Sequence, residues 1–358
     1  MKKILIVDDN MASLKQIAAL LSSDYEVSLV KSGALALKFC AQEKPDLILL
    51  DVEMPEMDGF ETHALIKKDP ALTQIPIIYL TGNNDTATEL RALESGAVDF
   101  VAKPPNRSIL QHRIELHLQL AEYQHSLEET VSNLEDSIVF SFAELIECKD
   151  ENSGLHVLRT SKFAELLAQE IYNRGIFGDK LTQADVENTS RAAPFHDIGK
   201  IGVSDTYLQK EGELTPEEYE EVKKHTVIGA DVIRKIYKRI PDFSYFEYAI
   251  HLAEWHHERY DGKGYPYGLG NETIPIYTQI FSVVNAYDAY RTDRSYRKGF
   301  SHDEACRLII KGRGTEFDPQ VVDVFDSIKD RFDVLKQEMT TQEGKMAPIL
   351  PFKRQDKR

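Results

Sequence analysis

The stretch from Ile109 to about Leu145 contains neither glycine nor proline, and its apolar residues recur with a heptad-like spacing. Such spacing predicts a long helix that winds around a second helix. One seam of that helix holds Leu110, His117, Gln124, Val131, Ile138 and Leu145, and the other holds Leu120, Leu127 and Leu134. Polar residues interrupt the first seam, so the coiled-coil pattern is firm only from about Leu120 onward. We favour a parallel two-stranded helix that couples two protomers. The alternative is a single long helix packed on its own domains.

Length and composition fit a folded protein with two domains, one on either side of this helix. The chain has 358 residues, of which 42% are hydrophobic and 28% charged, and its net charge of −16 argues against a nucleic-acid polymer or an anionic membrane as the main partner. Cys40, Cys148 and Cys306 lie too far apart to suggest a disulfide framework or a cysteine zinc site. The apolar runs fall well short of a membrane span or a signal-peptide core, so we expect a cytoplasmic protein.

Residues 1 to about 107 alternate between short apolar runs and amphipathic stretches. The runs predict strands at Lys3–Val7, Val27–Val30, Leu47–Leu50, Ile75–Leu80 and Phe100–Ala102. The stretches predict helices at Ala12–Leu21, Ala34–Ala41, Phe60–Ile66 and Thr86–Ser95. Repeated alternation of strand and helix predicts an α/β domain with a doubly wound, five-stranded parallel sheet. In such sheets the chemistry collects beyond the carboxyl ends of the strands.

The residues at these strand ends are all able to handle a phosphoryl group and a divalent cation. They are Asp8, Asp9, Asp51, Thr81 and Lys103. Adjacent carboxylates suit Mg²⁺, which prefers oxygen ligands, and an aspartate such as Asp51 can attack phosphorus to form an acyl phosphate. Thr81 would donate a hydroxyl, and Lys103 a positive charge, to the oxygens of the new phosphoryl group.

This first domain resembles the receiver domains of two-component response regulators, which have a flavodoxin-like fold. The motifs that carry the resemblance are Val7-Asp8-Asp9, Leu50–Pro55 with Asp58-Gly59, Thr81-Gly82 and Lys103-Pro104-Pro105. The resemblance implies that a sensor histidine kinase phosphorylates Asp51 and that Mg²⁺ binds beside it. It also places Phe100 where receivers carry an aromatic switch residue, and it suggests a cis peptide between Lys103 and Pro104.

From about Glu147 to Glu338 the sequence predicts helices joined by short loops, followed from Thr340 by a loose tail. The predicted helices include Thr160–Ile171, Pro216–His225, Ile228–Ile236, Tyr248–His257 and Tyr277–Arg291. Histidines gather in this helical region, and several stand beside acids, as in the pair His196-Asp197. Imidazole nitrogen together with carboxylate oxygen suits Fe, Mn, Zn or Ni.

The histidines and acids of this helical region offer more potential ligands than one metal ion can bind. We therefore expect two metals that share Asp197 and a bridging hydroxide. Such a pair can activate the hydroxide and stabilise both the entering and the leaving oxygen of an in-line phosphoryl displacement. Lys200 lies one turn beyond His196 and would offer a cation to a phosphate oxygen, so Asp197 and Lys200 are the predicted catalytic residues.

The same region resembles the HD superfamily of metal-dependent phosphohydrolases and, within it, the HD-GYP branch. The matching motifs are Phe195–Gly202, Leu214–Glu218, Lys224-His225-Thr226 with Gly229, His256–Pro266, Asn285–Ala289 and Arg294–Lys298. The family hydrolyses cyclic di-GMP to pGpG and often on to GMP, so the resemblance implies that activity, with Fe or Mn as the most expected metals. It implies the metal ligands His156, His196, Asp197, His225, His256, His257 and Asp288.

Two positions depart from the family pattern. Asn152 stands where members that bind three metals place a glutamate, which favours two metals here, and Lys210-Glu211-Gly212 stands where the family often has Lys-Pro-Gly. The expected substrate contacts are Lys200, Arg294, Arg297 and Lys298 for phosphate, with Tyr265 or Tyr296 stacked on guanine.

The sequence thus predicts a response regulator whose phosphodiesterase output is controlled by phosphorylation of Asp51. The expected boundaries are a receiver over residues 1–120, a helical linker over 121–146, an HD-GYP domain over 147–339 and a tail over 340–358. The resemblance implies a sensor kinase and diguanylate cyclase (GGDEF) proteins as partners, and the heptad pattern predicts a second copy of the chain. Two alternatives stay open: a binding module that senses cyclic di-GMP or docks on a diguanylate cyclase without turnover, and a phosphodiesterase for another cyclic dinucleotide.

Overall fold

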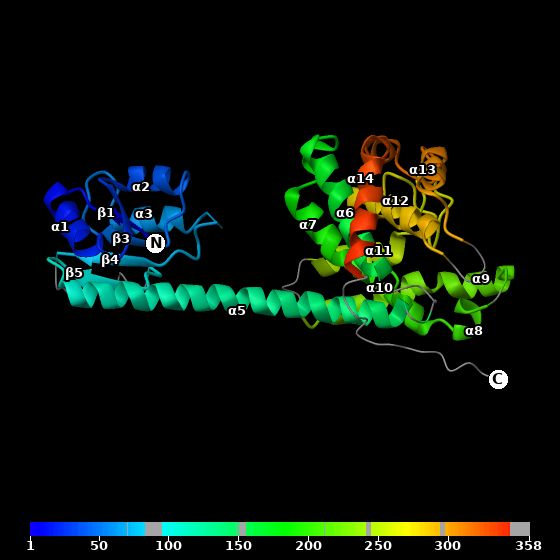
Figure 1. Cartoon of the computed structure of the whole chain (residues 1–358), viewed down its shortest axis with the longest axis horizontal. Coiled ribbons are helices and arrows are strands. Elements are labelled where there is room, and N and C mark those ends of the chain that lie inside the picture. The colour runs from blue at the N-terminus through cyan, green and yellow to red at the C-terminus, as the bar shows by residue number, and fades with distance from the viewer. Residues whose placement is uncertain are drawn as a thin grey trace. The chain divides into compact units, whose positions relative to one another are not determined.

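The chain forms two compact units, Met1–Asn133 and Leu134–Arg358, in a computed structural model (Figure 1). The residues described are 1–69, 71–82, 95–147, 149, 155–210, 212–240, 245–293 and 298–343. The predicted helix Thr86–Ser95 lies almost entirely outside them, as do Asn152, Glu211, Arg294, Tyr296 and Arg297. None of the helices in the described ranges combines the length and apolar character that crossing a bilayer needs.

The first unit confirms the predicted parallel five-stranded sheet, whose strand order is β2-β1-β3-β4-β5. The strands are β1 (Lys3–Val7), β2 (Glu26–Val30), β3 (Leu47–Asp51), β4 (Ile77–Thr81) and β5 (Asp99–Ala102). Every residue of β3 and β4 is buried, as expected for strands covered on both faces. The peptide between Lys103 and Pro104 is cis, as predicted.

Helices cover both faces of this sheet. They are α1 (Met11–Leu21), α2 (Gly33–Cys40), α3 (Gly59–Ile66) and the first turns of α5 (Arg107–Glu147). On one face, α1 and α5 contribute Leu14, Ile17, Leu110, Ile114 and other buried residues to an apolar layer; α2 and α3 contribute to the layer on the other face. Each helix that follows a strand end starts at a polar cap: for example, the Asn10 side chain accepts hydrogen bonds from the backbone at the start of α1.

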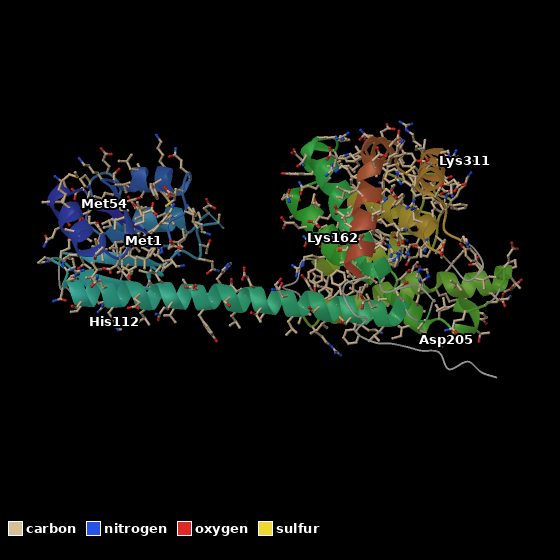
Figure 2. The ribbon with its side chains drawn as sticks, in the orientation of Figure 1. Met1, Met54, His112, Lys162, Asp205 and Lys311 are labelled. Atoms are coloured by element: carbon tan, nitrogen blue, oxygen red, sulfur yellow. The ribbon has the colours of Figure 1, made fainter. Side chains whose placement is uncertain are left out.

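The predicted long helix is confirmed as α5, which runs without a break from Arg107 to Glu147. Its first turns are held by Leu110 and Ile114 in the sheet layer, whereas His112 projects from an exposed face (Figure 2). Further along, Leu120, Leu127 and Leu134 are 53%, 50% and 58% exposed. The seam that the heptad pattern identifies is therefore largely uncovered within one copy of the chain.

The second unit is helical, as predicted, and its core is one continuous apolar cluster. Its helices are α6 (Leu155–Asn173), α7 (Gln183–Ala192), α8 (Asp205–Leu208), α9 (Pro216–Lys223), α10 (His225–Tyr237), α11 (Tyr245–Trp255), α12 (Ile276–Arg291), α13 (His302–Lys311) and α14 (Pro319–Glu343). Short 3-10 turns lie at Gly178–Lys180, Ala193–Phe195 and Ile198–Gly202. Phe163 of α6, Tyr287 of α12 and Phe332 of α14 pack together at the centre of the cluster.

Several boundaries differ from the sequence prediction, and two of them bear on the end of the helical unit and on the histidines. The helix α14 continues to Glu343, beyond the expected start of the tail at Thr340, because Met339 is still buried and the helix is anchored there. The helix α11 ends at Trp255 rather than at His257, so His256 and His257 lie just beyond a helix end. Both differences move the element end by only a few residues, where helix boundaries are hardest to read from sequence.

Candidate functional site

The first candidate site lies at the carboxyl end of the parallel sheet and consists of Asp8, Asp9, Asp51, Thr81 and Lys103; we call it the carboxylate centre. Carboxylate oxygens of the three aspartates lie within 4.8 Å of one another. The Lys103 ammonium lies 2.6 Å from Oδ2 of Asp8 and 2.7 Å from Oδ2 of Asp51. Thr81 ends β4 at the same edge, since its neighbour Leu80 pairs with Asp51 in the sheet. The fold thus brings together all five predicted residues.

Burial and charge act in opposite directions on Asp51, which is only 4% exposed. Burial raises the pKa of its carboxyl above the ordinary value, and the neighbouring Lys103 opposes that rise. Asp8 is held in place by hydrogen bonds from the Ser13 hydroxyl (2.6 Å) and the Asn10 amide (2.8 Å), whereas Asp9 is exposed. An all-oxygen site with one open side suits a hard cation such as Mg²⁺.

The second candidate site lies inside the helical unit, where ligands from separate elements meet; we call it the histidine centre. It consists of His156 (α6), His196 and Asp197 (between two 3-10 turns), His225 (first residue of α10), and His256 and His257 (after α11). Two groups of these side chains, His156/His196/Asp197 and His225/His256/His257, have potential ligand atoms within 4.8 Å of one another. Most of these side chains are buried.

Three imidazoles of this centre are oriented by carbonyls of their own helical turn. Nδ1 of His196 donates to the carbonyl of Ala193 (2.9 Å), and Nδ1 of His225 donates to that of Val222 (2.7 Å). Nδ1 of His256 likewise donates to a carbonyl, that of Leu252, at 2.8 Å. Because a carbonyl can only accept, Nδ1 carries a proton, and in its neutral form each ring presents the Nε2 lone pair as a potential metal ligand.

The Nε2 atoms converge on one another and on Asp197. Nε2 of His156 lies 3.3 Å from Nε2 of His196, and Nε2 of His225 lies 3.4 Å from Nε2 of His256. Oδ1 of Asp197 is buried and accepts no hydrogen bond from the residues that the structure describes, although Nε2 of His225 lies only 3.2 Å away. Nitrogen atoms that face each other at this range need a proton or a metal cation between them, so the donor set fits bound metal.

Burial also keeps these rings in the form that binds metal. It lowers the pKa of His257 to about 3, with the neighbouring His225 adding to the effect. Burial, followed by the nearby His257, lowers the pKa of His256 well below its ordinary value. A neutral imidazole is the ligand form, so these two rings need not lose a proton before metal binds at neutral pH.

Glycine lets the two halves of the histidine centre approach closely. A Cβ on Gly199 would overlap the carbonyl oxygen of His225 and crowd the amide of Gly229. The turn that carries His196 and Asp197 therefore lies directly against the first turn of α10. Any larger residue at position 199 would force His225 away from Asp197.

The predicted ligand Asp288 lies beside the centre, with both of its oxygens already engaged. Oδ2 accepts from Nδ1 of His156 (2.7 Å), and Arg159 donates to Oδ1 at 2.6 Å and to Oδ2 at 2.9 Å. Although burial favours the neutral form, His156 and Arg159 hold the pKa of Asp288 well below its usual range. In this arrangement the carboxylate orients His156 so that Nε2 faces His196.

Lys200 completes the centre with a buried positive charge. Its ammonium lies 2.8 Å from Oδ2 of Asp197 and 3.2 Å from Oε1 of Glu147, the last residue of α5. Lys200 is 7% exposed and Glu147 2% exposed. An ammonium paired in this way is fixed close to the position where Asp197 would meet a metal.

The segment that follows His257 folds back onto the centre. The Glu258 carboxylate accepts hydrogen bonds from the amides of Tyr267 (2.7 Å) and Leu269 (2.8 Å). A Cβ on Gly264 would collide with the backbone of His257 and Arg259, so glycine is required for this close return. The ring of Tyr265 stacks on that of His257 at 4.6 Å between centroids. The Gly-Tyr-Pro sequence therefore braces a potential metal ligand.

A cavity of about 1080 Å³ opens at the histidine centre. Among the described residues, its lining includes Lys200 and Tyr265 but not Lys298, which is exposed. The lining also contains basic and aromatic side chains that the sequence analysis did not select: Lys210, Lys263, Arg259, Tyr207 and Tyr219. Of the other predicted substrate contacts, Arg294 and Arg297 lie outside the described residues.

Sequence reasoning missed three buried charged residues of this site. Arg159 follows His156 by three positions, so helical spacing could have placed it on the same face. Glu258 follows the two histidines directly, but a lone acid there carries no signal of its role. Glu147 had no local signal, because its partner Lys200 is 53 residues away.

Comparison with known proteins agrees with this geometry. Residues 4–115 match the family described as response regulator receiver domain, and residues 155–321 match the family described as HD domain. A probable cyclic di-GMP phosphodiesterase of Vibrio cholerae is 36% identical over 97% of this chain and 82% of that protein. The cyclic di-GMP phosphodiesterase response regulator RpfG of Xanthomonas campestris is 32% identical over 89% and 86%. A cyclic di-GMP phosphodiesterase of Thermotoga maritima is 31% identical over 94% and 93%.

Proposed function

The chain belongs to the response regulators that join a receiver domain to a C-terminal HD domain of the HD-GYP type, and from this membership we propose that it hydrolyses cyclic di-GMP to pGpG, GMP or both. The HD domain is its phosphodiesterase output. Relatives that are 31–36% identical and aligned over most of both chains are named cyclic di-GMP phosphodiesterases, which supports this substrate.

The observation that carries the proposal is the convergence of imidazole Nε2 atoms on the Asp197 carboxylate. Nε2 of His225 and of His256 lie 3.2 and 3.7 Å from its buried Oδ1, and Nε2 of His196 lies 3.2 Å from Oδ2. We propose that His156, His196 and Asp197 hold one divalent metal and that His225, His256 and His257 hold a second, with Asp197 shared. Asp288, which contacts His156, stays in the proposal as the remaining metal ligand. Nitrogen and oxygen donors of this kind suit Fe or Mn. When bound, such metals would activate water and stabilise negative charge on the phosphate.

The residues of the chain itself would bind and orient the substrate. Lys200, Lys210 and Lys263 line the cavity and supply cations for the two phosphates of a cyclic dinucleotide. Tyr219 is a candidate for base stacking, whereas the stacking of Tyr265 on His257 supports a role in holding that ligand. Arg294, Arg297 and Lys298 stay in the proposal as contacts to the phosphate that is not cleaved.

The receiver would control this activity. We propose that a sensor histidine kinase phosphorylates Asp51, with Mg²⁺ held by Asp8, Asp9 and Asp51 and with Thr81 and Lys103 contacting the phosphoryl oxygens. The added charge would reorder Thr81 and Phe100 and so shift the packing of α5. The close contact of Lys103 with both Asp8 and Asp51 supports this arrangement.

The linker helix would pair with a second copy. The exposure of Leu120, Leu127 and Leu134 at seven-residue spacing supports a parallel two-stranded coiled coil. Sedimentation equilibrium should give a dimer, and Leu127→Lys should shift it toward monomer. Diguanylate cyclases of the GGDEF type stay a proposed partner on the basis of the family.

Metal analysis of anaerobically purified protein, combined with hydrolysis assays, tests the main proposal. We expect two metals in the HD domain and linear product from cyclic di-GMP, with slower turnover of cyclic GMP-AMP offered alongside. Binding of cyclic di-GMP without product by fully metallated protein would instead indicate a sensor. Faster turnover of another cyclic dinucleotide would reassign the substrate.

A further inference from the structure

The last turn of α5 ends in a carboxylate inside the helical unit. Ala143, Ile146 and Glu147 are 5%, 7% and 2% exposed, so this turn is buried although most of the preceding residues of α5 are not. A glutamate at such a place is costly unless a cation compensates it. The roles proposed so far for the receiver and for the histidine centre do not use Glu147.

The charge that compensates Glu147 belongs to the proposed catalytic lysine. The ammonium of Lys200 lies between two acids, 3.2 Å from Oε1 of Glu147 and 2.8 Å from Oδ2 of Asp197. Lysine carries its charge on a flexible four-carbon stem with three donors, so its direction depends on fixed acceptors. Glu147 thus gives Lys200 an anchor that is separate from the potential metal ligand Asp197.

A second contact ties the end of α5 to the turn that carries Lys200. Nζ of Lys149 lies 3.3 Å from the carbonyl oxygens of both Ile201 and Val203 and forms an ion pair with Asp205 at 3.0 Å. The side chain of Glu147 contacts this turn at Lys200, and that of Lys149 contacts its backbone. The residues around the end of the linker helix therefore help to hold this turn, which also packs against α10 at Gly199.

We propose that Glu147 is a positioning residue of the phosphodiesterase centre, which holds the Lys200 ammonium toward the substrate phosphate. The proposal rests on the function proposed above. Replacing Glu147 by glutamine keeps the size of the side chain but removes the charge that fixes Lys200. Outer residues that orient reacting groups change activity by about 10–100-fold when removed, so we expect a loss of that size.

A double-mutant cycle tests whether Glu147 acts through Lys200. On metal-loaded full-length protein, Glu147→Gln should lower kcat about 10–100-fold with unchanged metal content and less than about 3-fold change in KM. In a Lys200→Gln background the same change should add less than about 3-fold. Glu144→Gln is the matched control, since Glu144 lies on the same helix but is exposed, and it should behave as wild type.

A second measurement does not require turnover. Acylation of lysines in the metal-free protein, quantified by mass spectrometry, should modify Lys200 several-fold faster in Glu147→Gln than in wild type or Glu144→Gln. Additive effects in the cycle, loss of metal in Glu147→Gln, or unchanged acylation of Lys200 would each overturn the positioning role. If metallated wild type leaves every cyclic dinucleotide intact, the proposed function fails, while the acylation result still decides whether Glu147 anchors Lys200.

Discussion

The two candidate cation sites of this chain are built from different donors on different scaffolds. The carboxylate centre uses side chains at the ends of parallel strands, leaves Asp9 exposed, and already holds an internal cation in Lys103. The histidine centre buries imidazoles from several helical elements and fixes their Nδ1 protons with backbone carbonyls. The first arrangement suits a hard, exchangeable ion that comes and goes with a phosphoryl group, and the second suits a retained transition metal.

The largest effect should come from the shared ligand of the histidine centre. Asp197→Ala removes the carboxylate that faces both groups of imidazoles, so we expect loss of bound metal together with at least about a 10³-fold loss of kcat/KM. Metal analysis and product formation are measured on the same preparation. Wild-type turnover by this variant would refute the assignment of the site.

The matching change in the receiver should leave the histidine centre intact. Asp51→Asn should abolish phosphoryl incorporation from acetyl phosphate, detected by intact-mass spectrometry, and retain the full metal content of the HD domain. The two centres would then be chemically separate. Loss of HD metal in Asp51→Asn would break that separation.

An intermediate effect on metal affinity is expected from Arg159, which donates hydrogen bonds to Asp288. Arg159→Met removes both hydrogen bonds from the guanidinium to Asp288 and so loosens the carboxylate that orients His156. Metal affinity, measured by competition with a chelating dye, should fall about 10–100-fold. Lys162→Met on the exposed face of the same helix is the control. Unchanged affinity in Arg159→Met would mean that His156 needs no such support.

The smallest effect concerns a buried imidazole that lies apart from both centres. Burial lowers the pKa of His63 in the receiver to about 4, from 6.5, while its Nδ1 lies 2.9 Å from the Tyr79 hydroxyl. Because the unfolded chain takes up this proton first, the stability that neutral His63 contributes is fully present above pH 6.5. It is lost as the pH falls toward 4.

Between pH 7.5 and pH 5 this linkage should cost the receiver about 2 kcal/mol. Hydrogen exchange of peptides that cover β3, corrected for the pH dependence of the intrinsic rate, measures that change. His63→Gln should flatten the pH dependence of the receiver's stability. Added metal should not restore the stability lost at low pH, whereas metal should stabilise the helical unit. An equal slope in wild type and variant would exclude His63 as the source.

Local signals explain what could be read from the sequence. Asp51 and Lys103 follow apolar strands, so the edge of the sheet on which they meet was predictable once the parallel sheet was recognised. His196-Asp197 and His256-His257 stand out because each pair places two potential metal ligands side by side in the sequence. Helical spacing could have placed Arg159 on the face of His156, but its partner Asp288 lies 129 residues away. Glu147 was not found because its partner Lys200 lies 53 residues away and no local pattern links the two.

The element boundaries show the same limit. Ile75 was assigned to the fourth strand, which begins only at Ile77, since a buried apolar residue ahead of Pro76 looks like strand. The expected break at Thr340 was wrong by four residues because a polar stretch can continue a helix once Met339 is anchored.

The carbonyls that hold His196, His225 and His256 each come from three or four residues earlier in the chain. These rings therefore acquire their orientation within a single turn, before distant segments need to meet. An empty centre of this kind should keep its shape, so stripping the ions with a chelator and returning them should regenerate the enzyme without passing through an unfolded chain.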